Sequence, residues 1–290
     1  MSKDTKDKNL SQLCAGQAID LEVFWLLLKE EAERVIKAEP TLKPLIGDVI
    51  LSQNTFADSL ASRLARKLSR DDMPRDQVYA ILSEIIEQTP DILQSVARDL
   101  SAIYDRDPAC NSTLEPLLFF KGFHAITNYR ISHILWKNGR TALSLYFQSI
   151  GSEIFQVDIH PAAEIGCGIM LDHATSFVVG ETGIIEDNVS ILHEVTLGGT
   201  GKESGLRHPI VRSGVLIGAG TKILGRVEIG RNAKIGAGSV VLDSVAPNTT
   251  VVGVPAKIVG SNEDSEPALN MDQRLNCEKI MLSSLDSAGL

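Results

Sequence analysis

The sequence predicts an α+β protein, in which an N-terminal α-helical bundle precedes a parallel β-helix of hexapeptide repeats and a flexible C-terminal tail. Three observations predict it. Across residues 15–156, apolar residues recur at three- and four-residue steps. Across residues 157–260, aliphatic residues recur at every sixth position. From residue 261 to 290 the chain is acidic and has neither period, which is typical of a flexible segment.

Helical spacing and helix-end signals define the first segment. Apolar residues three and four positions apart within 21–28 predict an amphipathic helix. Thr89-Pro90-Asp91 predicts the start of another helix, with Thr89 as its N-cap, and Asp107-Pro108 predicts its end. Further helices are predicted over 116–136 and 141–155.

A six-residue step defines the second segment. It is carried by Ile217, Ile223, Ile229, Ile235 and Val241, and upstream by Ile159, Ile165, Leu171 and Phe177. This period fits neither a helix nor a simple strand and is typical of a parallel β-helix, in which each unit supplies one short flat side with its aliphatic residue inward. Three sides complete a coil, so equivalent positions recur about every 18 residues, and the segment forms roughly four to five coils.

The six-residue step is interrupted twice. Phe177 continues the step from Leu171, so the first interruption is predicted between Phe177 and Ile185, which are eight residues apart. The second lies between Leu197 and Val211, fourteen residues apart, and predicts a projecting loop of about eight residues. Loops that project from a rigid solenoid often carry function.

Composition excludes several classes of protein. The chain has 290 residues, 43% hydrophobic residues and a net charge of −9, which argues against a nucleic-acid partner. The four cysteines have no metal-like spacing and are expected as free thiols. The N-terminus lacks a secretory signal, and the longest apolar run, Val23–Leu28, is too short to span a membrane. We therefore expect a cytoplasmic protein without a membrane partner.

Two Asp/His groupings, Asp158–His160 and Asp172–His173, lie in the stretch VDIHPAAEIGCGIMLDH. A carboxylate that accepts the proton of one imidazole nitrogen leaves the other nitrogen free to act as a base. Spacing alone leaves two interpretations open, because the same residues could form a structural hydrogen-bonded pair. His208, in the projecting loop, is either a functional residue or a solvated one.

The motifs DIHPAAEIGCGIMLDHAT, VSILHEVTLGGTGK, RHP and VVGVPAKIVG, together with YDRDPA and FFKGFHAITNYRISHILW in the helical segment, resemble the serine O-acetyltransferase family. The resemblance covers about residues 20–260. It implies that the β-helix is left-handed. It also implies trimers with active sites between subunits, or dimers of trimers formed through the helical segment.

The resemblance implies transfer of the acetyl group of acetyl-CoA to the hydroxyl of L-serine, giving O-acetyl-L-serine for cysteine biosynthesis, with inhibition by L-cysteine and no metal. His173 resembles the general base and Asp158 its orienting partner. Asp107 and Asp172 resemble the residues that hold the serine ammonium. Arg207 and His208 resemble the pair that receives the serine carboxylate and lines the pocket. These residue types suit the chemistry. The serine hydroxyl becomes a good nucleophile only when a base accepts its proton. The ammonium and carboxylate of an amino acid are bound by acidic and basic side chains, respectively.

The family holds CoA against corners made of small residues. The matching positions are Gly199, Thr200, Ala219, Gly220 and Ala237. Lys234 and Lys257 are candidates for the CoA phosphates, although each is equally well explained as a solvated surface lysine. The sequence departs from the family at Leu206, before Arg-His-Pro, and at Ser176, where the family commonly has glycine. The C-terminal tail of related enzymes binds cysteine synthase (O-acetylserine sulfhydrylase), and here it ends in Leu290.

Three alternatives remain open at this point. The first is a hexapeptide-repeat acetyltransferase that acts on a sugar or another hydroxyl acceptor. The second is a zinc-dependent lyase that uses His173, His193 and His208. The third is a non-catalytic scaffold whose tail and solenoid bind cysteine synthase.

Overall fold

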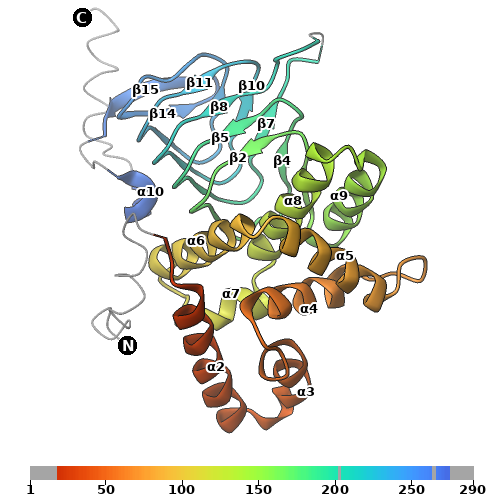
Figure 1. Cartoon of the computed structure of the whole chain (residues 1–290). Coiled ribbons are helices and arrows are strands. Elements are labelled where there is room, and N and C mark those ends of the chain that lie inside the picture. Colours follow the sequence, from red (N-terminus) through yellow and green to blue (C-terminus); the bar gives the residue numbers. More distant parts are fainter. Residues whose placement is uncertain (1–17, 202–203, 263–265, 275–290) are drawn as a thin grey trace, which may run out of the picture. The chain divides into compact units, whose positions relative to one another are not determined.

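The computed structural model describes residues 18–201, 204–262 and 266–274. The chain divides into two compact units, Met1–Phe155 and Gln156–Leu290. The first contains the helices that lead to the solenoid and the second contains the strands (Figure 1). These are called below the helical unit and the β-helix unit.

Helices account for most of the described helical unit, as the sequence predicts. Its elements are α2 (Leu21–Ala38), η2 (Pro40–Leu42), α3 (Lys43–Ile46), η3 (Gly47–Leu51), α4 (Phe56–Leu68), α5 (Arg75–Gln88), α6 (Asp91–Arg106), α7 (Leu114–Phe119), α8 (Lys121–Lys137) and α9 (Thr141–Phe155). Helix α6 starts at Asp91 after Pro90, so the predicted N-cap role of Thr89 is wrong. The helix predicted over 116–136 is two helices, because Phe120 adopts an extended backbone between α7 and α8.

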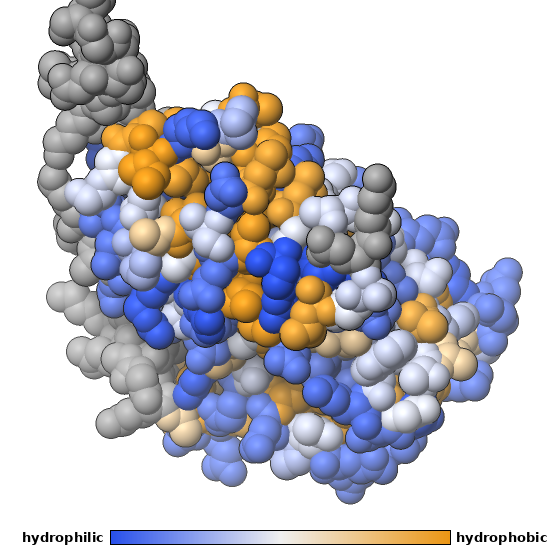
Figure 2. All heavy atoms as spheres, turned by 90° about the horizontal axis from the view of Figure 1, so that it is seen from above, coloured by the Kyte–Doolittle hydropathy of each residue, from blue (hydrophilic) through white to orange (hydrophobic). Residues whose placement is uncertain are grey.

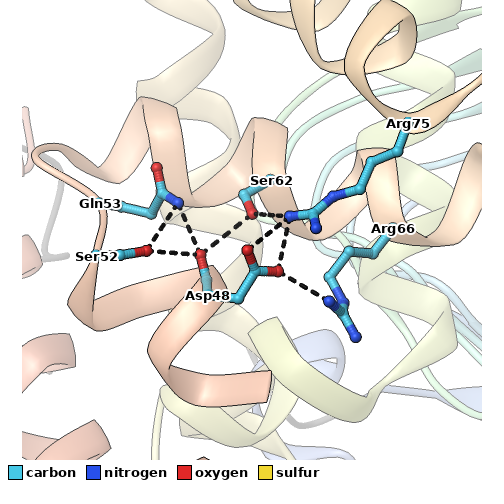
Figure 3. A network of polar contacts seen from close by, with 6 residues as sticks. All are labelled: Asp48, Ser52, Gln53, Ser62, Arg66 and Arg75. Atoms are coloured by element: carbon cyan, nitrogen blue, oxygen red, sulfur yellow. Dashed lines mark hydrogen bonds and ion pairs between the residues drawn. The ribbon is translucent and has the colours of Figure 1, made fainter. Parts of the chain in front are cut away.

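A cluster of polar contacts ties the π-helical turn η3 to α4 and α5 (Figure 3). The carboxylate of Asp48 accepts hydrogen bonds from Arg66 (2.9 Å) and Arg75 (2.7 Å). Its backbone carbonyl accepts hydrogen bonds from Ser52 and Gln53. Burial alone would raise the pKa of Asp48, but the bonds from Arg75 and Arg66 lower it below its ordinary value. The turn is therefore held by a shared charged group.

Three parallel sheets form the walls of the β-helix unit. Sheet 1 contains β1 (Val157–Ile159), β4 (Phe177–Val179), β7 (Thr196–Gly198), β10 (Lys222–Leu224) and β13 (Val240–Val241); sheet 2 contains β2 (Glu164–Ile165), β5 (Ile184–Ile185), β8 (Ile210–Val211) and β11 (Glu228–Ile229); sheet 3 contains β3 (Met170–Leu171), β6 (Ser190–Ile191), β9 (Leu216–Ile217), β12 (Lys234–Ile235), β14 (Thr249–Gly253) and the antiparallel β15 (Ala256–Ser261). The chain visits the sheets in turn, so this unit is the left-handed β-helix of hexapeptide repeats that was predicted, with about 5 turns.

Inward aliphatic residues stack from coil to coil and are almost completely buried. In sheet 1 the register pairs Val179 with Ile159 on one side and with Leu197 on the other. Phe177, which the sequence predicts to point inward, is also buried and pairs with Val157. Both ends of β4 therefore point inward, but Val179 and not Phe177 continues the line between Ile159 and Leu197. The two extra residues of the first coil therefore lie between Leu171 and Val179, and the predicted interruption between 177 and 185 is displaced to this corner.

Part of the segment predicted to be a flexible tail is structured. Residues 267–270 form the short helix α10 (Pro267–Asn270), which lies against the β-helix. Ala268 is fully buried, and its carbonyl accepts a hydrogen bond from Ser190 Oγ at 2.7 Å. Leu290 lies outside the described residues.

Among the described residues, no helix is both long and apolar enough to cross a membrane.

Buried polar side chains link α6, α7 and α8. Arg130 of α8 forms an ion pair with the fully buried Asp99 of α6 at 2.7 Å. His124, also on α8, is buried, and its Nε2 lies 2.8 Å from the carbonyl oxygen of Leu117. Burial lowers the pKa of His124 from 6.5 to about 3. The imidazole is therefore neutral in the folded protein at any moderate pH.

This buried imidazole predicts an acid-sensitive stability. Below pH 6.5 the unfolded chain binds a proton at His124 that the folded chain does not, so the free energy of unfolding falls as the pH decreases toward 3. We expect His124 alone to contribute a loss of about 2 kcal/mol between pH 7.5 and pH 5. Urea unfolding of the wild type and of His124→Gln measures it. The variant should lose that part of the pH dependence, whereas His173→Gln, at an exposed histidine, should keep it; equal slopes in the wild type and His124→Gln would contradict the prediction.

Candidate active site

The corner that carries His173 has an unusual backbone. It connects β3 to β4 and contains the two extra residues of the first coil. His173, Ala174 and Ser176 have φ values of 55°, 62° and 59°, which are costly for residues with a Cβ. The His173 side chain is 72% exposed. Ser176 is where the family commonly has glycine, and the positive φ explains why glycine suits that position.

Carboxylates lie near this corner. Asp172 Oδ2 is 3.8 Å from His173 Nε2, a distance of an ion pair rather than a hydrogen bond. Asp158 lies in the middle of β1 and pairs in register with Val178, in the strand that follows the corner. Its charge favours the protonated form of His160, which places it close to that ring as well. Asp158 therefore lies in the first strand of sheet 1, whereas Asp172 directly follows β3 of sheet 3 and precedes His173.

A second corner, between β7 and β8, contains the eight extra residues of the third coil and ends in Arg207 and His208. Thr182 holds this segment from the coil before. Its Oγ1 accepts hydrogen bonds from the backbone N–H groups of Arg207 (3.0 Å) and His208 (3.2 Å). Its own N–H donates to His208 Nδ1 at 3.1 Å. Because a backbone N–H can only donate, Nδ1 must accept, and the proton of the neutral imidazole is on Nε2.

Charged groups surround the Arg207–His208 segment. Arg207 forms an ion pair with Glu181 at 2.7 Å, and this hydrogen bond lowers the pKa of the Glu181 carboxyl. Burial, and then the adjacent Arg207 guanidinium, lower the pKa of His208. Burial also lowers the pKa of His160, which lies near the same Glu181 carboxylate. The corner therefore holds the Arg207–Glu181 ion pair beside two imidazoles, His160 and His208, whose pKa values are lowered.

Gly180 makes room for the His208 ring. A Cβ on Gly180 would lie 1.9 Å from Nε2 and 2.1 Å from Cδ2 of His208. The ring thus packs directly on the backbone of the preceding coil. His208, which the sequence left open as a solvated loop residue, is buried.

Small residues continue the His173 corner along the solenoid. Counting two residues past the paired positions of sheet 3 gives His173, His193, Ala219 and Ala237 in successive coils. The backbone is tightly packed there, since a Cβ on Gly218 would lie 2.6 Å from the Ala237 nitrogen. Gly220 has a φ of +75°. Two of the predicted CoA positions, Ala219 and Ala237, therefore lie in line with the predicted base, and Gly220 directly follows the first of them.

The remaining predicted cofactor residues are in different settings. Gly199 lies against Arg207 and the exposed Thr200 lies against Gly225 in the projecting loop region. Lys234 is only 8% exposed and its Nζ donates to the Arg274 carbonyl at 2.7 Å. Lys257 is an exposed residue of β15.

Asp107 belongs to the helical unit. It is the C-cap of α6, and its Oδ1 accepts a hydrogen bond from the Ala109 N–H at 2.8 Å. The turn that ends α6 fixes this carboxylate to its own backbone.

Sequence reasoning missed several residues of the site. Gly180, Glu181 and Thr182 were not singled out, although Thr182 and His208 are 26 positions apart. That separation is one coil of 18 residues plus the eight-residue loop, so the spacing could have revealed the contact. No group of three potential metal ligands occurs in the described part of the chain. Of the histidines weighed for zinc, His173 and His193 are neighbours, whereas His208 borders the opposite side of sheet 1.

Comparison with known proteins gives consistent matches. Residues 24–128 match the family model described as "Serine acetyltransferase, N-terminal", and residues 208–243 match "Bacterial transferase hexapeptide (six repeats)". The serine acetyltransferase of Salmonella typhimurium is 51% identical over 257 residues, which cover 89% of this chain and 94% of the relative. These matches support the serine acetyltransferase prediction and not the alternative of a sugar acceptor.

Solved structures agree with this assignment. The serine acetyltransferase of Vibrio cholerae has a TM-score of 0.85 at 49% identity, covering 87% of this chain and 98% of the other. The Brucella abortus serine acetyltransferase, solved in complex with coenzyme A, has a TM-score of 0.80 at 49% identity, covering 82% and 95%. Further serine acetyltransferase structures contain cysteine (49% identity) or, for the Neisseria gonorrhoeae protein, serine (48% identity).

The contact between Gly180 and His208 predicts that Gly180→Ala displaces the imidazole. Because the new methyl would overlap the ring, we expect the free energy of unfolding to fall by about 1–3 kcal/mol. Urea unfolding measures this loss. Gly47→Ala is the control, since a Cβ there meets nothing within 4 Å. Wild-type stability of Gly180→Ala, with an unchanged His208 imidazole signal in NMR spectra, would show that the packing is not as described.

Proposed function

The chain belongs to the serine acetyltransferase family, and we propose that it transfers the acetyl group of acetyl-CoA to the hydroxyl of L-serine, with His173 as the general base. The family assignment rests on the 51% identity over most of both chains. Relatives solved with coenzyme A and with serine support both substrates. O-acetyl-L-serine is the product, and it serves cysteine biosynthesis.

One observation carries the assignment of the base. His173 is exposed on a strained corner, in line with the small residues Ala219 and Ala237 of the following coils. A pantetheine arm lying along those residues would bring its thioester to the imidazole. His173 then accepts the serine hydroxyl proton as the oxygen attacks the thioester carbon. Asp158 orients the imidazole and stabilises the imidazolium, and the proton finally goes to the departing thiolate.

The amino-acid groups of the substrate are held by opposite charges. Arg207 and His208 receive the carboxylate, because the guanidinium and the Nε2–H are donors at the same corner. In the absence of substrate the Glu181 carboxylate forms an ion pair with the Arg207 guanidinium. Asp107 and Asp172 hold the ammonium.

The substrate site is completed between subunits. The His173 corner and the Arg207 corner border opposite sides of sheet 1, whose strands are up to three residues wide, so they are about 10 Å apart within one chain. A free amino acid is shorter than that. Exposed apolar residues support association: Leu206, Leu242, Val254 and Ile258 are all exposed, and Figure 2 shows a broad apolar area over the β-helix unit. The assembly is a homotrimer or a dimer of trimers, with a helical domain over 15–156 and a catalytic domain over 157–260.

Regulation acts at the same site as substrate binding. L-Cysteine differs from serine by sulfur in place of the hydroxyl oxygen, so Arg207, His208 and Asp107 bind it as an inhibitor; a relative solved with cysteine supports this. The enzyme acts in the cytoplasm. Its C-terminal tail binds cysteine synthase, although Leu290 lies outside the described residues.

The first test measures acetyl-CoA consumption with L-serine, monitored by the release of the CoA thiol. The wild type should turn over serine and be inhibited by added cysteine. His173→Ala should lower kcat by about 10²–10⁴-fold, because a general base contributes that much. Asp158→Asn should lower kcat more than it raises the KM for serine. Equal rates with a sugar acceptor, or an unchanged kcat for His173→Ala, would contradict the proposed function.

The two candidate lysines differ in their surroundings and are expected to differ in their effect on acetyl-CoA binding. Lys257 is exposed and able to meet a phosphate, whereas the Lys234 ammonium is held by the Arg274 carbonyl. We expect Lys257→Ala to raise the KM for acetyl-CoA about fivefold, equivalent to about 1 kcal/mol. Lys234→Ala, the matched control, should change that KM by less than about twofold. The opposite order would show that the C-terminal segment moves away from Lys234 when CoA binds.

A further inference from the structure

His193 is not used by the mechanism above, yet it lies beside the proposed base. The strand register of sheet 3 places it one coil after His173 and one coil before Ala219. Successive coils are about 4.8 Å apart. Along this corner, Ala219 and Ala237 have small side chains, whereas the coil next to the proposed base carries the imidazole of His193.

The two imidazole rings are in direct contact. Their centroids are 5.7 Å apart and their planes are inclined by 76°, so one ring presents its edge to the face of the other. This is the favourable arrangement for two aromatic rings. The His173 side chain is 72% exposed, so solvent surrounds most of it. A ring packed against it therefore removes orientations that would turn the base away from the substrate.

Hydrogen bonding does not explain the imidazole at position 193. Its Nδ1 is buried and has no hydrogen-bond partner among the described residues. A proton on Nδ1 would be buried without an acceptor, so the tautomer with its proton on Nε2 is favoured. A histidine kept only for structure would normally have its buried nitrogen paired. The backbone carbonyl of His193 is paired, with the Gly220 N–H at 3.0 Å, so the main chain of this rung is fixed.

We propose that His193 is a positioning residue for the serine acetyltransferase reaction, which holds the His173 imidazole in its reactive orientation through edge-to-face ring contact. This inference rests on the proposed function. The role needs a flat ring at position 193 and does not need its nitrogen atoms. His193 would therefore affect the rate of the chemical step and not the binding of either substrate.

Steady-state kinetics of the full-length protein with acetyl-CoA and L-serine test the proposal. His193→Leu removes the ring and should lower kcat about tenfold or more, with the KM values of both substrates within about twofold of the wild type. His193→Phe keeps the ring and should retain kcat within about threefold. In a His173→Ala background, His193→Leu should cause no further loss, because a residue that acts through another is not additive with it. Thermal unfolding confirms that each variant is folded, and His193→Asn replaces the leucine variant if that one does not fold.

Several outcomes would overturn the inference. A wild-type kcat for His193→Leu would remove any role, and an equal loss in the leucine and phenylalanine variants would show that the nitrogen atoms matter and not the ring. An increased KM for acetyl-CoA with unchanged kcat would place His193 in the cofactor site instead. If the wild type does not acetylate L-serine at all, the proposed function itself fails, and the inference with it.

Discussion

The stacking of inward aliphatic residues is the constraint on which the β-helix unit depends. Val179 must lie between Ile159 and Leu197, because a shift of one residue would turn every side chain of the strand to the opposite face. No strand can therefore absorb extra residues. The two insertions of this solenoid occur at corners instead, and both corners carry candidate active-site residues. The repeat that builds the wall also determines where irregular structure is allowed.

The two corners position their side chains by different physical means. The His173 corner has three non-glycine residues with positive φ, so backbone strain accompanies an exposed imidazole. The Arg207 corner is held by hydrogen bonds to Thr182 and by packing on Gly180, and its charges are paired before any substrate arrives. The backbone of Arg207 and His208 is thus fixed before substrate binds, whereas in the proposed reaction the Arg207 guanidinium exchanges Glu181 for the substrate carboxylate.

The helical unit is stabilised by buried polar contacts as well as by apolar packing. The Arg130–Asp99 ion pair joins α8 to α6, the helix that ends at Asp107. Removing one partner of such a pair would leave an uncompensated buried charge and would strongly destabilise the folded protein. The same helix therefore combines a fixed internal ion pair with the carboxylate that is proposed to meet the substrate ammonium. His124 adds a neutral buried imidazole to this set.

The sequence alone determined the fold class, because a six-residue period in aliphatic residues is the pattern of a parallel β-helix. Its local motifs, through their resemblance to a family, predicted His173, Arg207 and His208 as site residues. It also revealed the eight-residue loop from the spacing between Leu197 and Val211. Tertiary structure decided what spacing cannot. It placed Val179 rather than Phe177 between Ile159 and Leu197, paired Glu181 with Arg207, and set the Arg274 carbonyl on Lys234. Periodicity reports which residues are buried along one stretch of chain. Which side chains meet across coils depends on the register between strands, which is fixed only when the whole stack packs.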